Sequence, residues 1–106
     1  MNTSLDVLII GGGIGGLATA LALHDIGLRP RVFEQAREIK PLGVGINLLP
    51  HSVRELTELG LADELGATGV EVEELRFYTQ YGLEIQRETR GTQAGYNWPQ
   101  YSIHRG

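Results

Sequence analysis

The chain has 106 residues, 42% of them hydrophobic, which is enough for one modest domain with a limited core. Its 13 acidic and 9 basic residues give a formal net charge of -4 without a basic block, so we expect no nucleic-acid partner. The sequence contains no cysteine, which excludes disulfides and thiol redox chemistry. Any redox chemistry therefore needs a cofactor.

The N-terminal residues argue against secretion and membrane insertion. They lack the positively charged region of a secretory signal, and Asp6 interrupts the apolar run that follows them. The longest apolar run, Val7 to Ile10, is far shorter than the roughly 20 residues that span a bilayer. We therefore expect a cytoplasmic protein without membrane contact.

The first third of the chain has the pattern of a βαβ unit. Leu5 to Ile10 is a short, β-branched run that ends at a glycine, which predicts a strand buried on both faces of a parallel sheet. Gly15 to Ile26 has helical apolar spacing, and Gly27 stands where a C-terminal cap belongs. Arg31 to Glu34 predicts a second strand, parallel to the first and reached by a right-handed crossover.

The middle of the chain predicts a loop and then a helix. From Arg37 to Leu49 the residues lack periodicity and include Pro41, which indicates an irregular loop. Pro50 is suited to a first helical turn, and apolar spacing continues to Gly60. A short helical turn is expected over Leu61 to Leu65.

Strand patterns dominate the last third. Alternating apolar residues from Val70 to Phe77 and from Leu83 to Gln86 predict a hairpin around the turn at Gln80 to Gly82, although the alternation slips at Glu73 and Glu74. Tyr101 to His104 predicts one more short strand. The expected fold class is α/β, with a βαβ unit, a helix and a β-hairpin.

A glycine motif follows the first predicted strand and opens the first predicted helix. Gly11, Gly13 and Gly16 match the spacing G-x-G-x-x-G, which is a strong dinucleotide signal in this context. The α/β pattern is therefore expected to be the N-terminal part of a Rossmann-like FAD/NAD(P)-binding fold. Gly11 permits a tight turn, Gly13 lets a pyrophosphate approach the backbone, and Gly16 allows the helix to pack close to the strands. The helix N-terminus then offers N–H groups and its dipole to the phosphates.

Glu34 ends the second predicted strand, about 20 residues after the glycines, where a carboxylate accepts hydrogen bonds from an adenosine ribose. The same carboxylate repels a 2′-phosphate, which disfavours NADP at this position. The glycines and Glu34 leave FAD and NAD as alternatives, because both contain the same ADP half.

Further along, the sequence resembles one family. The segment Arg37 to Pro50, with Gly43-Val44-Gly45 inside it, resembles the flavin loop of the flavin-dependent aromatic hydroxylases of the p-hydroxybenzoate hydroxylase type, also called group A FAD monooxygenases. Tyr101 to Arg105 resembles the His-Arg element of that family. The stretches "LGVGIN" and "PQYSIHRG" are most similar to the bacterial members that hydroxylate phenazine carboxylates.

The resemblance implies a set of FAD-binding residues. The pyrophosphate would be held by Gly11, Gly13, Ile14, Gly15 and Gly16. Glu34 would bind the adenosine ribose, and Arg37 would lie beside the adenine or the ribose. Val44 and Gly45 would present backbone to the isoalloxazine region, while Arg105 would contact the ribityl or phosphate portion.

The resemblance also implies what the whole protein does. Residues 1–106 would be the N-terminal part of the FAD-binding domain of a two-domain flavoprotein, without the substrate-binding region and the later flavin motifs. The complete enzyme would use NAD(P)H and O2 to hydroxylate an aromatic substrate, and the chain alone would be inactive. Two alternatives stay open: another FAD or NAD oxidoreductase of the two-dinucleotide superfamily, and a truncated, non-catalytic nucleotide-binding module.

Other candidates are weaker. His104 has no carboxylate partner in the sequence pattern, so we assign no catalytic residue. His24 and His51 show no ligand spacing, and no metal site is predicted. Tyr96, Trp98 and Tyr101 are candidates for an aromatic substrate pocket, but their position around Pro99 favours a packed loop.

Overall fold

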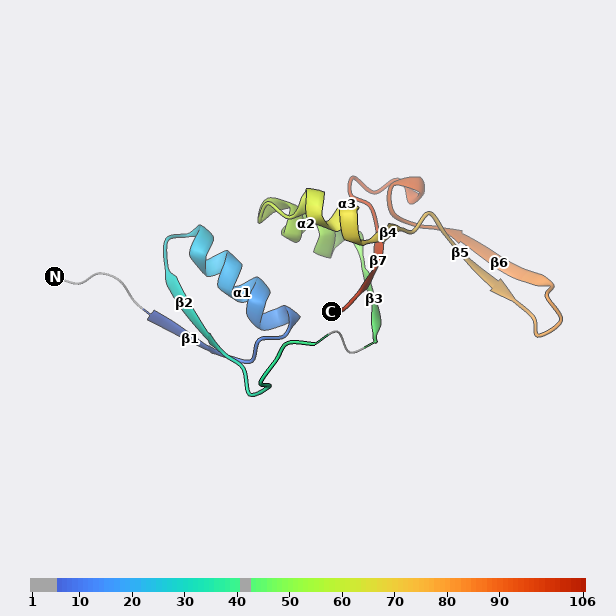
Figure 1. Ribbon diagram of the computed structural model, residues 1–106. Coiled ribbons are helices and arrows are strands. Elements are labelled where there is room, and N and C mark those ends of the chain that lie inside the picture. Colours follow the sequence, from blue (N-terminus) through green and yellow to red (C-terminus); the bar gives the residue numbers. More distant parts are fainter. Residues whose placement is uncertain (1–5, 41–42) are drawn as a thin grey trace. The chain divides into compact units, whose positions relative to one another are not determined.

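The computed structural model describes residues 6–40 and 43–106, so the predicted positions Leu5, Pro41 and Leu42 lie outside the described residues. The chain divides into two compact units, residues 1–40 and residues 41–106. Figure 1 shows the first unit in blue to teal and the second in green to red. Each unit is described below by itself.

The first unit is the predicted βαβ unit. It consists of β1 (Asp6–Ile10), α1 (Ile14–Asp25) and β2 (Arg29–Phe33). The two strands are parallel, with Asp6 opposite Arg29 and Ile10 opposite Phe33, and α1 lies along them (Figure 1). The predicted parallel pair is therefore confirmed, although β2 begins earlier than expected and ends before Glu34.

The C-terminus of α1 ends at the predicted glycine. Gly27 has a φ of 89°, in the left-handed region, and its N–H donates to the His24 carbonyl at 3.0 Å. The Leu28 N–H donates to the Leu23 carbonyl at 3.0 Å. These two bonds form a Schellman motif, which confirms the predicted cap.

The expectation that β1 is buried on both faces is wrong for this chain. Leu8 and Ile10 are 60% and 84% exposed, whereas Val7 and Ile9 on the other face are half-buried. A parallel sheet buries both faces only where helices cover both. Within the described residues the β1–β2 sheet has two strands and one covering helix, so this unit by itself leaves one apolar face of the sheet uncovered.

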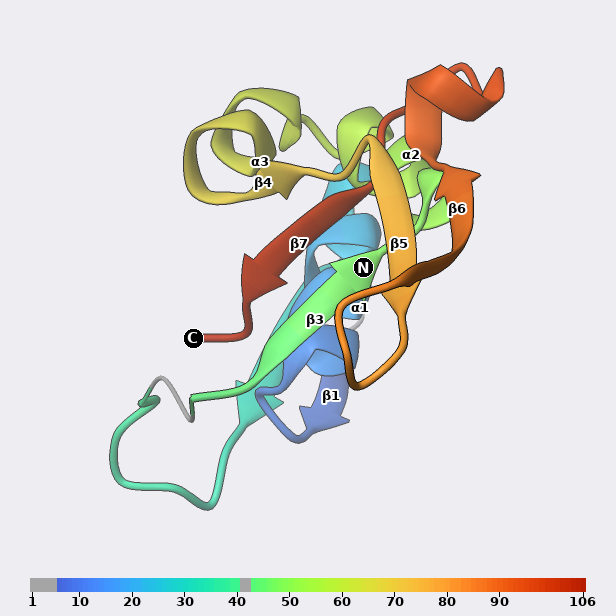
Figure 2. The same cartoon turned by 90° about the vertical axis from the view of Figure 1, so that its right-hand side faces the viewer.

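The second unit contains an antiparallel sheet with the strand order β3-β7-β4. Its strands are β3 (Gly45–Leu48), β7 (Tyr101–His104) and β4 (Val70–Glu71). Figure 2 shows β7 alongside β3, and in their register Gly45 lies opposite His104 and Leu48 opposite Tyr101. β7 is the predicted last strand and is confirmed.

β3 corrects the prediction of an irregular loop over Arg37 to Leu49. Four residues are too few to show strand periodicity, and the partner strand β7 lies far along the chain. Long-range pairing, and not local sequence preference, therefore determines this strand.

Two helices follow β3. The first, α2 (Pro50–Glu58), starts with a proline in its first turn as predicted, and its end is capped by Gly60, which has a φ of 87°. The second, α3 (Ala62–Thr68), is longer than the predicted turn. Val53 and Leu65, one from each helix, are the buried hydrophobic side chains among the described residues.

The predicted hairpin is confirmed, with a shorter first strand. β5 (Glu74–Tyr78) and β6 (Glu84–Thr89) pair antiparallel, and Gly82 in their turn has a φ of 84°. Val70 belongs instead to β4, which pairs with β7. The slip in alternation at Glu73 and Glu74 is thus the point at which the chain leaves one sheet and enters another.

A 3-10 helix, η1 (Gly91–Ala94), connects β6 to the loop before β7. Gly91 has a φ of 59°, and a Cβ atom there would lie 2.7 Å from the Gln100 backbone nitrogen. Glycine is therefore required at this close approach. Throughout the described ranges, no helix combines the length and the apolar character needed to cross a membrane.

Candidate functional site

The glycine turn between β1 and α1 is tied to the end of β2. The Gly11 N–H donates to the Phe33 carbonyl at 2.7 Å, and Gly11 has a φ of 112°. Residues with a Cβ rarely adopt that conformation, so the turn needs glycine for its backbone shape. The backbone conformation and the bond to Phe33 thus both shape this turn.

Gly16 is required for a different reason. A Cβ atom at this position would lie 2.0 Å from the Gly11 carbonyl oxygen and 3.4 Å from Cγ2 of Ile9. The first contact is with backbone, which cannot move aside as a flexible side chain can. The predicted close packing of the helix at Gly16 is confirmed.

Among the described residues, no side-chain hydrogen bond caps the N-terminus of α1. Gly13 is the N-cap in an extended conformation, with no side-chain hydrogen bond to the cap, and the first turn carries no acidic residue. The first N–H groups of a helix have no intrahelical partners, and the dipole adds roughly half a positive charge there. This arrangement suits an anion.

Gly15 contrasts with its neighbour Gly16. It has no positive φ, and a Cβ atom built on it would meet nothing within 4 Å. Neither the backbone conformation nor a neighbouring group among the described residues requires glycine at this position. The open space lies at the first turn of α1, beside the anion-favouring N–H groups.

Glu34 makes contacts that its sequence position did not reveal. Its Oε1 accepts the Gly12 N–H at 2.9 Å, and its Oε2 accepts the Ala36 N–H at 2.9 Å. The carboxylate therefore binds the glycine turn directly.

Arg37 is exposed in the bend that follows β2, three positions after Glu34. It belongs to the same unit as the glycine turn. The structure thus brings the glycines and Glu34 into contact, and it places Arg37 on the segment that leads away from them.

A second group of predicted residues lies in the second unit. The Arg105 N–H donates to the Val44 carbonyl at 2.8 Å, and Gly45 pairs with His104 across the β3–β7 ladder. Val44, Gly45 and Arg105 are far apart in the sequence, yet they are adjacent at one end of the ladder. Because the sequence predicted a loop here, it did not show that these residues meet.

Gly45 resembles Gly15 in its surroundings. It has no positive φ, and a Cβ atom there would meet nothing within 4 Å. Glycine weakens a strand, so its presence in β3 has no benefit for the fold itself. A close approach by a group outside the described residues is one physical reason for glycine in such a strand.

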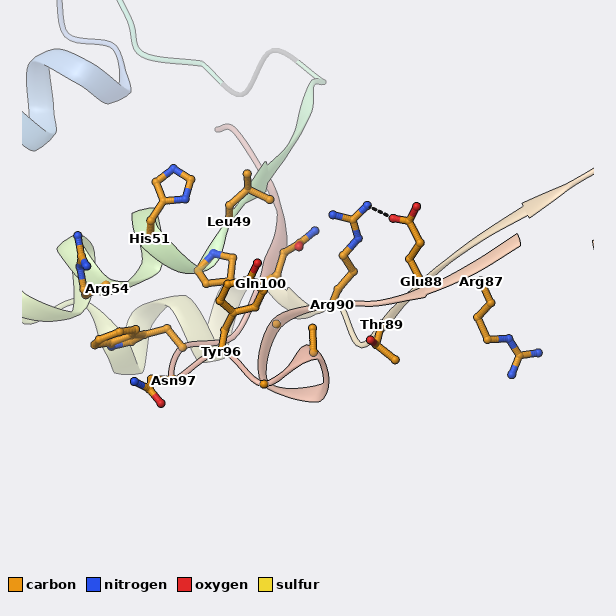
Figure 3. Close-up of a pocket in the computed structure, with 15 residues that line it drawn as sticks. Leu49, His51, Arg54, Arg87, Glu88, Thr89, Arg90, Tyr96, Asn97 and Gln100 are labelled. Atoms are coloured by element: carbon orange, nitrogen blue, oxygen red, sulfur yellow. Dashed lines mark hydrogen bonds and ion pairs between the residues drawn. The ribbon is translucent and has the colours of Figure 1, made fainter. Parts of the chain in front are cut away.

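The remaining candidates take no part in these two groups. The His104 Nδ1 accepts the Gly106 N–H at 3.1 Å. No group of three or more metal-binding side chains comes together in the described part of the chain. Tyr96 and Trp98, two of the weaker candidates for an aromatic pocket, line an open pocket between α2, the end of β6 and the loop after η1 (Figure 3), whereas Tyr101 lies in β7 and is not among the lining residues.

Comparison with known proteins agrees with these features. Residues 4–105 match the model of a family described as FAD binding domain. Over 105 residues, or 98% of this chain, it is 50% identical to a protein of Lysobacter antibioticus named phenazine 1,6-dicarboxylic acid hydroxylase PhzS. It is 38% identical over 109 residues to 3-amino-4-hydroxybenzoate 2-monooxygenase of Streptomyces cremeus, with 99% of this chain covered.

Solved structures share the fold. The crystal structure of p-nitrophenol 4-monooxygenase PnpA from Pseudomonas putida DLL-E4 matches 99% of this chain with a TM-score of 0.85 and 24% identity, covering 27% of that protein. Klebsiella pneumoniae HpxO, solved with FAD and uric acid, matches 95% of this chain with a TM-score of 0.82 and 24% identity, covering 26% of that protein.

The chain spans only 26% of the length of the Lysobacter hydroxylase and 27% of the Streptomyces monooxygenase. The match to the family model nevertheless extends over almost all of its own residues. From the glycine turn, the fold and these matches together, the chain belongs to the FAD-binding domain family found in flavin-dependent monooxygenases and hydroxylases.

Proposed function

We propose that residues 1–106 form the N-terminal part of the FAD-binding domain of a cytoplasmic flavin-dependent monooxygenase. The complete enzyme would use NAD(P)H and O2 to hydroxylate an aromatic substrate, and the relative named as a phenazine 1,6-dicarboxylic acid hydroxylase favours a phenazine-like one. The observation that carries the proposal is the open space at Gly15, next to helix N–H groups that no side chain caps.

The glycine turn would hold the pyrophosphate of FAD. Gly11 shapes the turn, and Gly16 keeps α1 close to it. The N–H groups near Gly13, Ile14 and Gly15 would then donate to phosphate oxygens, since a side chain at Gly15 would occupy the space that the phosphates need. The helix dipole contributes roughly 0.3–1 kcal/mol per favourable charge contact.

The adenosine would lie beside Glu34 and Arg37. Because the Glu34 carboxylate is anchored to the Gly12 and Ala36 N–H groups, its position is set before the cofactor arrives. A preorganised acceptor loses little entropy on binding a ribose hydroxyl. Its negative charge also disfavours a 2′-phosphate, which is compatible with FAD.

The flavin end would be held by the second unit. The open space at Gly45 would let the flavin ring lie close to the backbone of Val44 and Gly45, and Arg105 would donate to the ribityl or phosphate oxygens. When bound, FAD supplies the redox chemistry of the reaction. The residues described here would bind and orient it, and none would act as an acid, base or nucleophile.

The first test is a titration of the purified chain with FAD, followed by flavin fluorescence, with NAD as a parallel ligand. We expect saturable binding of FAD and not of NAD. Binding of both ligands with equal affinity would favour a general dinucleotide site. A chain that is folded by circular dichroism but binds neither would contradict the proposed cofactor role of residues 1–106.

A further inference from the structure

The pocket beside Trp98 shares no lining residue with the residues assigned to FAD. It has a volume of about 900 Å³ and lies between the N-terminal turn of α2, the end of β6 and the loop after η1. That volume is within the usual range for small-molecule sites. Figure 3 shows side chains from all three segments around it.

The charge of the pocket is opposite to that of the chain. The chain has a net charge of -4, yet Arg54, Arg87 and Arg90 line the pocket and Glu88 is its one carboxylate. Arg87 pairs with Glu84 at 2.9 Å along the hairpin, and Figure 3 shows it directed away from the other lining residues. Arg54 and Arg90 therefore supply the positive charge of the pocket.

Arg54 belongs to the aromatic side of the pocket. Its guanidinium lies over the Trp98 ring, 5.7 Å from the ring centroid, and Tyr96 lines the same pocket. The Arg54 Nε and Nη2 atoms donate to Glu55 at 3.2 and 2.9 Å. Since a guanidinium has five N–H donors, these bonds leave others for a ligand.

Arg90 carries the clearest sign of a missing partner. Its Nη2 atom pairs with Glu88 at 2.5 Å, but its Nε atom is buried and has no hydrogen-bond partner among the described residues. Gln100, a polar residue that is only 6% exposed, lines the same pocket. Buried donors in proteins almost always have acceptors, so this donor is unusual. The Nε atom itself has almost no accessible surface, so a ligand would accept hydrogen bonds from the remaining Nη N–H groups of Arg90.

We propose that this pocket binds a small planar ring that carries an anionic group. The ring would lie against the Tyr96 and Trp98 side, and the anionic oxygens would accept hydrogen bonds from Arg54 and Arg90. A carboxylate on an aromatic ring and the phosphate of a nucleotide share this chemistry. Both would be recognised by the arginines and the aromatic side chains in the same way.

Trp98 is the only tryptophan in the chain and lines the pocket, so its fluorescence reports binding directly. We would titrate the folded chain with benzoate and, separately, with adenosine 5′-monophosphate. Benzamide and adenosine are the matched neutral ligands. We expect saturable quenching by at least one anion, weakened by added salt, and at least about tenfold weaker binding of its neutral counterpart.

Variants locate the site. Arg54→Gln and Arg90→Gln should each weaken binding of the anion about tenfold, whereas Arg76→Gln, on the hairpin and outside the lining residues, should leave it unchanged. If Arg54→Gln is unfolded by circular dichroism, Arg54→Lys is used in its place. Lysine keeps the positive charge but lacks the forked N–H donors of arginine, so binding of the anion should still weaken. Equal quenching by charged and neutral ligands, or binding unaffected by both arginine variants, would overturn the proposal, as would the absence of quenching by either anion.

The result is independent of FAD binding. Loss of anion binding in Arg54→Gln with an unchanged FAD titration would support two separate sites. If FAD displaces the anions in the Trp98 fluorescence titration, the pocket is part of the flavin site and the inference is wrong.

Discussion

The two groups of proposed FAD-binding residues are built in different ways. In the first unit, a turn of neighbouring glycines is shaped by Gly11 and packed by Gly16, and Glu34 is bonded to the same turn. In the second unit, Val44 and Arg105 meet only because β3 pairs with β7. The first group depends on local backbone geometry, and the second depends on pairing between distant segments.

This difference separates glycines that serve the fold from glycines that leave space. At Gly16 a Cβ atom would meet backbone, and at Gly11 the backbone conformation is left-handed. At Gly15 and Gly45 neither reason applies. Substitutions of the two kinds should therefore affect different measurements, namely protein stability for the first and cofactor binding for the second.

The largest effect is expected for Gly16→Ala. The added methyl group would lie 2.0 Å from the Gly11 carbonyl oxygen, so α1 must move away from the turn. Overpacking of this severity should lower the free energy of unfolding by about 3 kcal/mol, measured by urea denaturation. The matched control is Gly15→Ala, one position earlier on the same helix.

Gly15→Ala should leave the fold intact or stabilise it by about 0.5–1 kcal/mol, because alanine is the better helix former. It should nevertheless weaken FAD binding, since the methyl group occupies the open space at the helix N-terminus. Equal loss of stability in both alanine variants would contradict the distinction between the two kinds of glycine.

The effect of Glu34→Ala should be the next in size. It removes an acceptor of the ribose and the anchor of the Gly12 and Ala36 N–H groups, and we expect FAD binding weakened by about 1–3 kcal/mol. A flavin fluorescence titration measures this change. Glu34→Gln keeps one acceptor oxygen, so its affinity for FAD should lie between the affinities of the wild type and of Glu34→Ala. Unchanged flavin affinity in Glu34→Ala would refute the assignment.

These first predictions concern the part of the molecule that the sequence described best. The glycine spacing, the strand before it and the cap at Gly27 depend on short-range rules, so the order of elements in the βαβ unit could be predicted, although β2 begins earlier than expected. The hydrogen bond from Gly12 to Glu34 could not, because it depends on the exact approach of two loops. The exposure of Leu8 and Ile10 was also missed, because an apolar run does not reveal whether both faces are covered.

The second unit was harder to predict. β3 differs from the predicted loop because its partner β7 is distant in the sequence, and Val70 pairs with β7 although its spacing predicts a place in the hairpin. The pocket beside Trp98 depends on three segments brought together by these pairings. The resemblance to a known family implies flavin contacts for Val44, Gly45 and Arg105, and only the structure shows the ladder that brings them together.

Gly45→Ala tests the second group. The Cβ atom would meet nothing within 4 Å, and alanine loses less backbone entropy than glycine in a strand, so we expect unchanged or slightly increased stability. FAD binding should weaken by about 1 kcal/mol if the flavin ring lies against this backbone. An Ala variant with lower stability and normal FAD affinity would instead assign Gly45 to the fold.

The smallest effect should come from the pH dependence of the hairpin, which has no part in either group. The pKa of Glu74 is lowered from its usual 4.5 by its hydrogen bond to Arg76 and by the nearby charges of Arg76 and Arg87. The pKa of Glu84 is lowered mainly by its hydrogen bond to Arg87. These carboxylates bind protons more weakly in the folded hairpin than in the unfolded chain, and they are exposed, so solvent weakens the effect.

The sign of this pH dependence follows from the lowered pKa values. The contribution to stability is fully present well above pH 4.5 and is lost as the pH falls through the lower pKa values of the folded hairpin. The cross-strand contact between Phe77 and Gln86, followed by nuclear magnetic resonance, should weaken over that range. In Arg87→Gln the dependence should be reduced, because Glu84 loses its main partner. If the contact instead weakened on raising the pH from 5 to about 8, groups other than these carboxylates would control the hairpin.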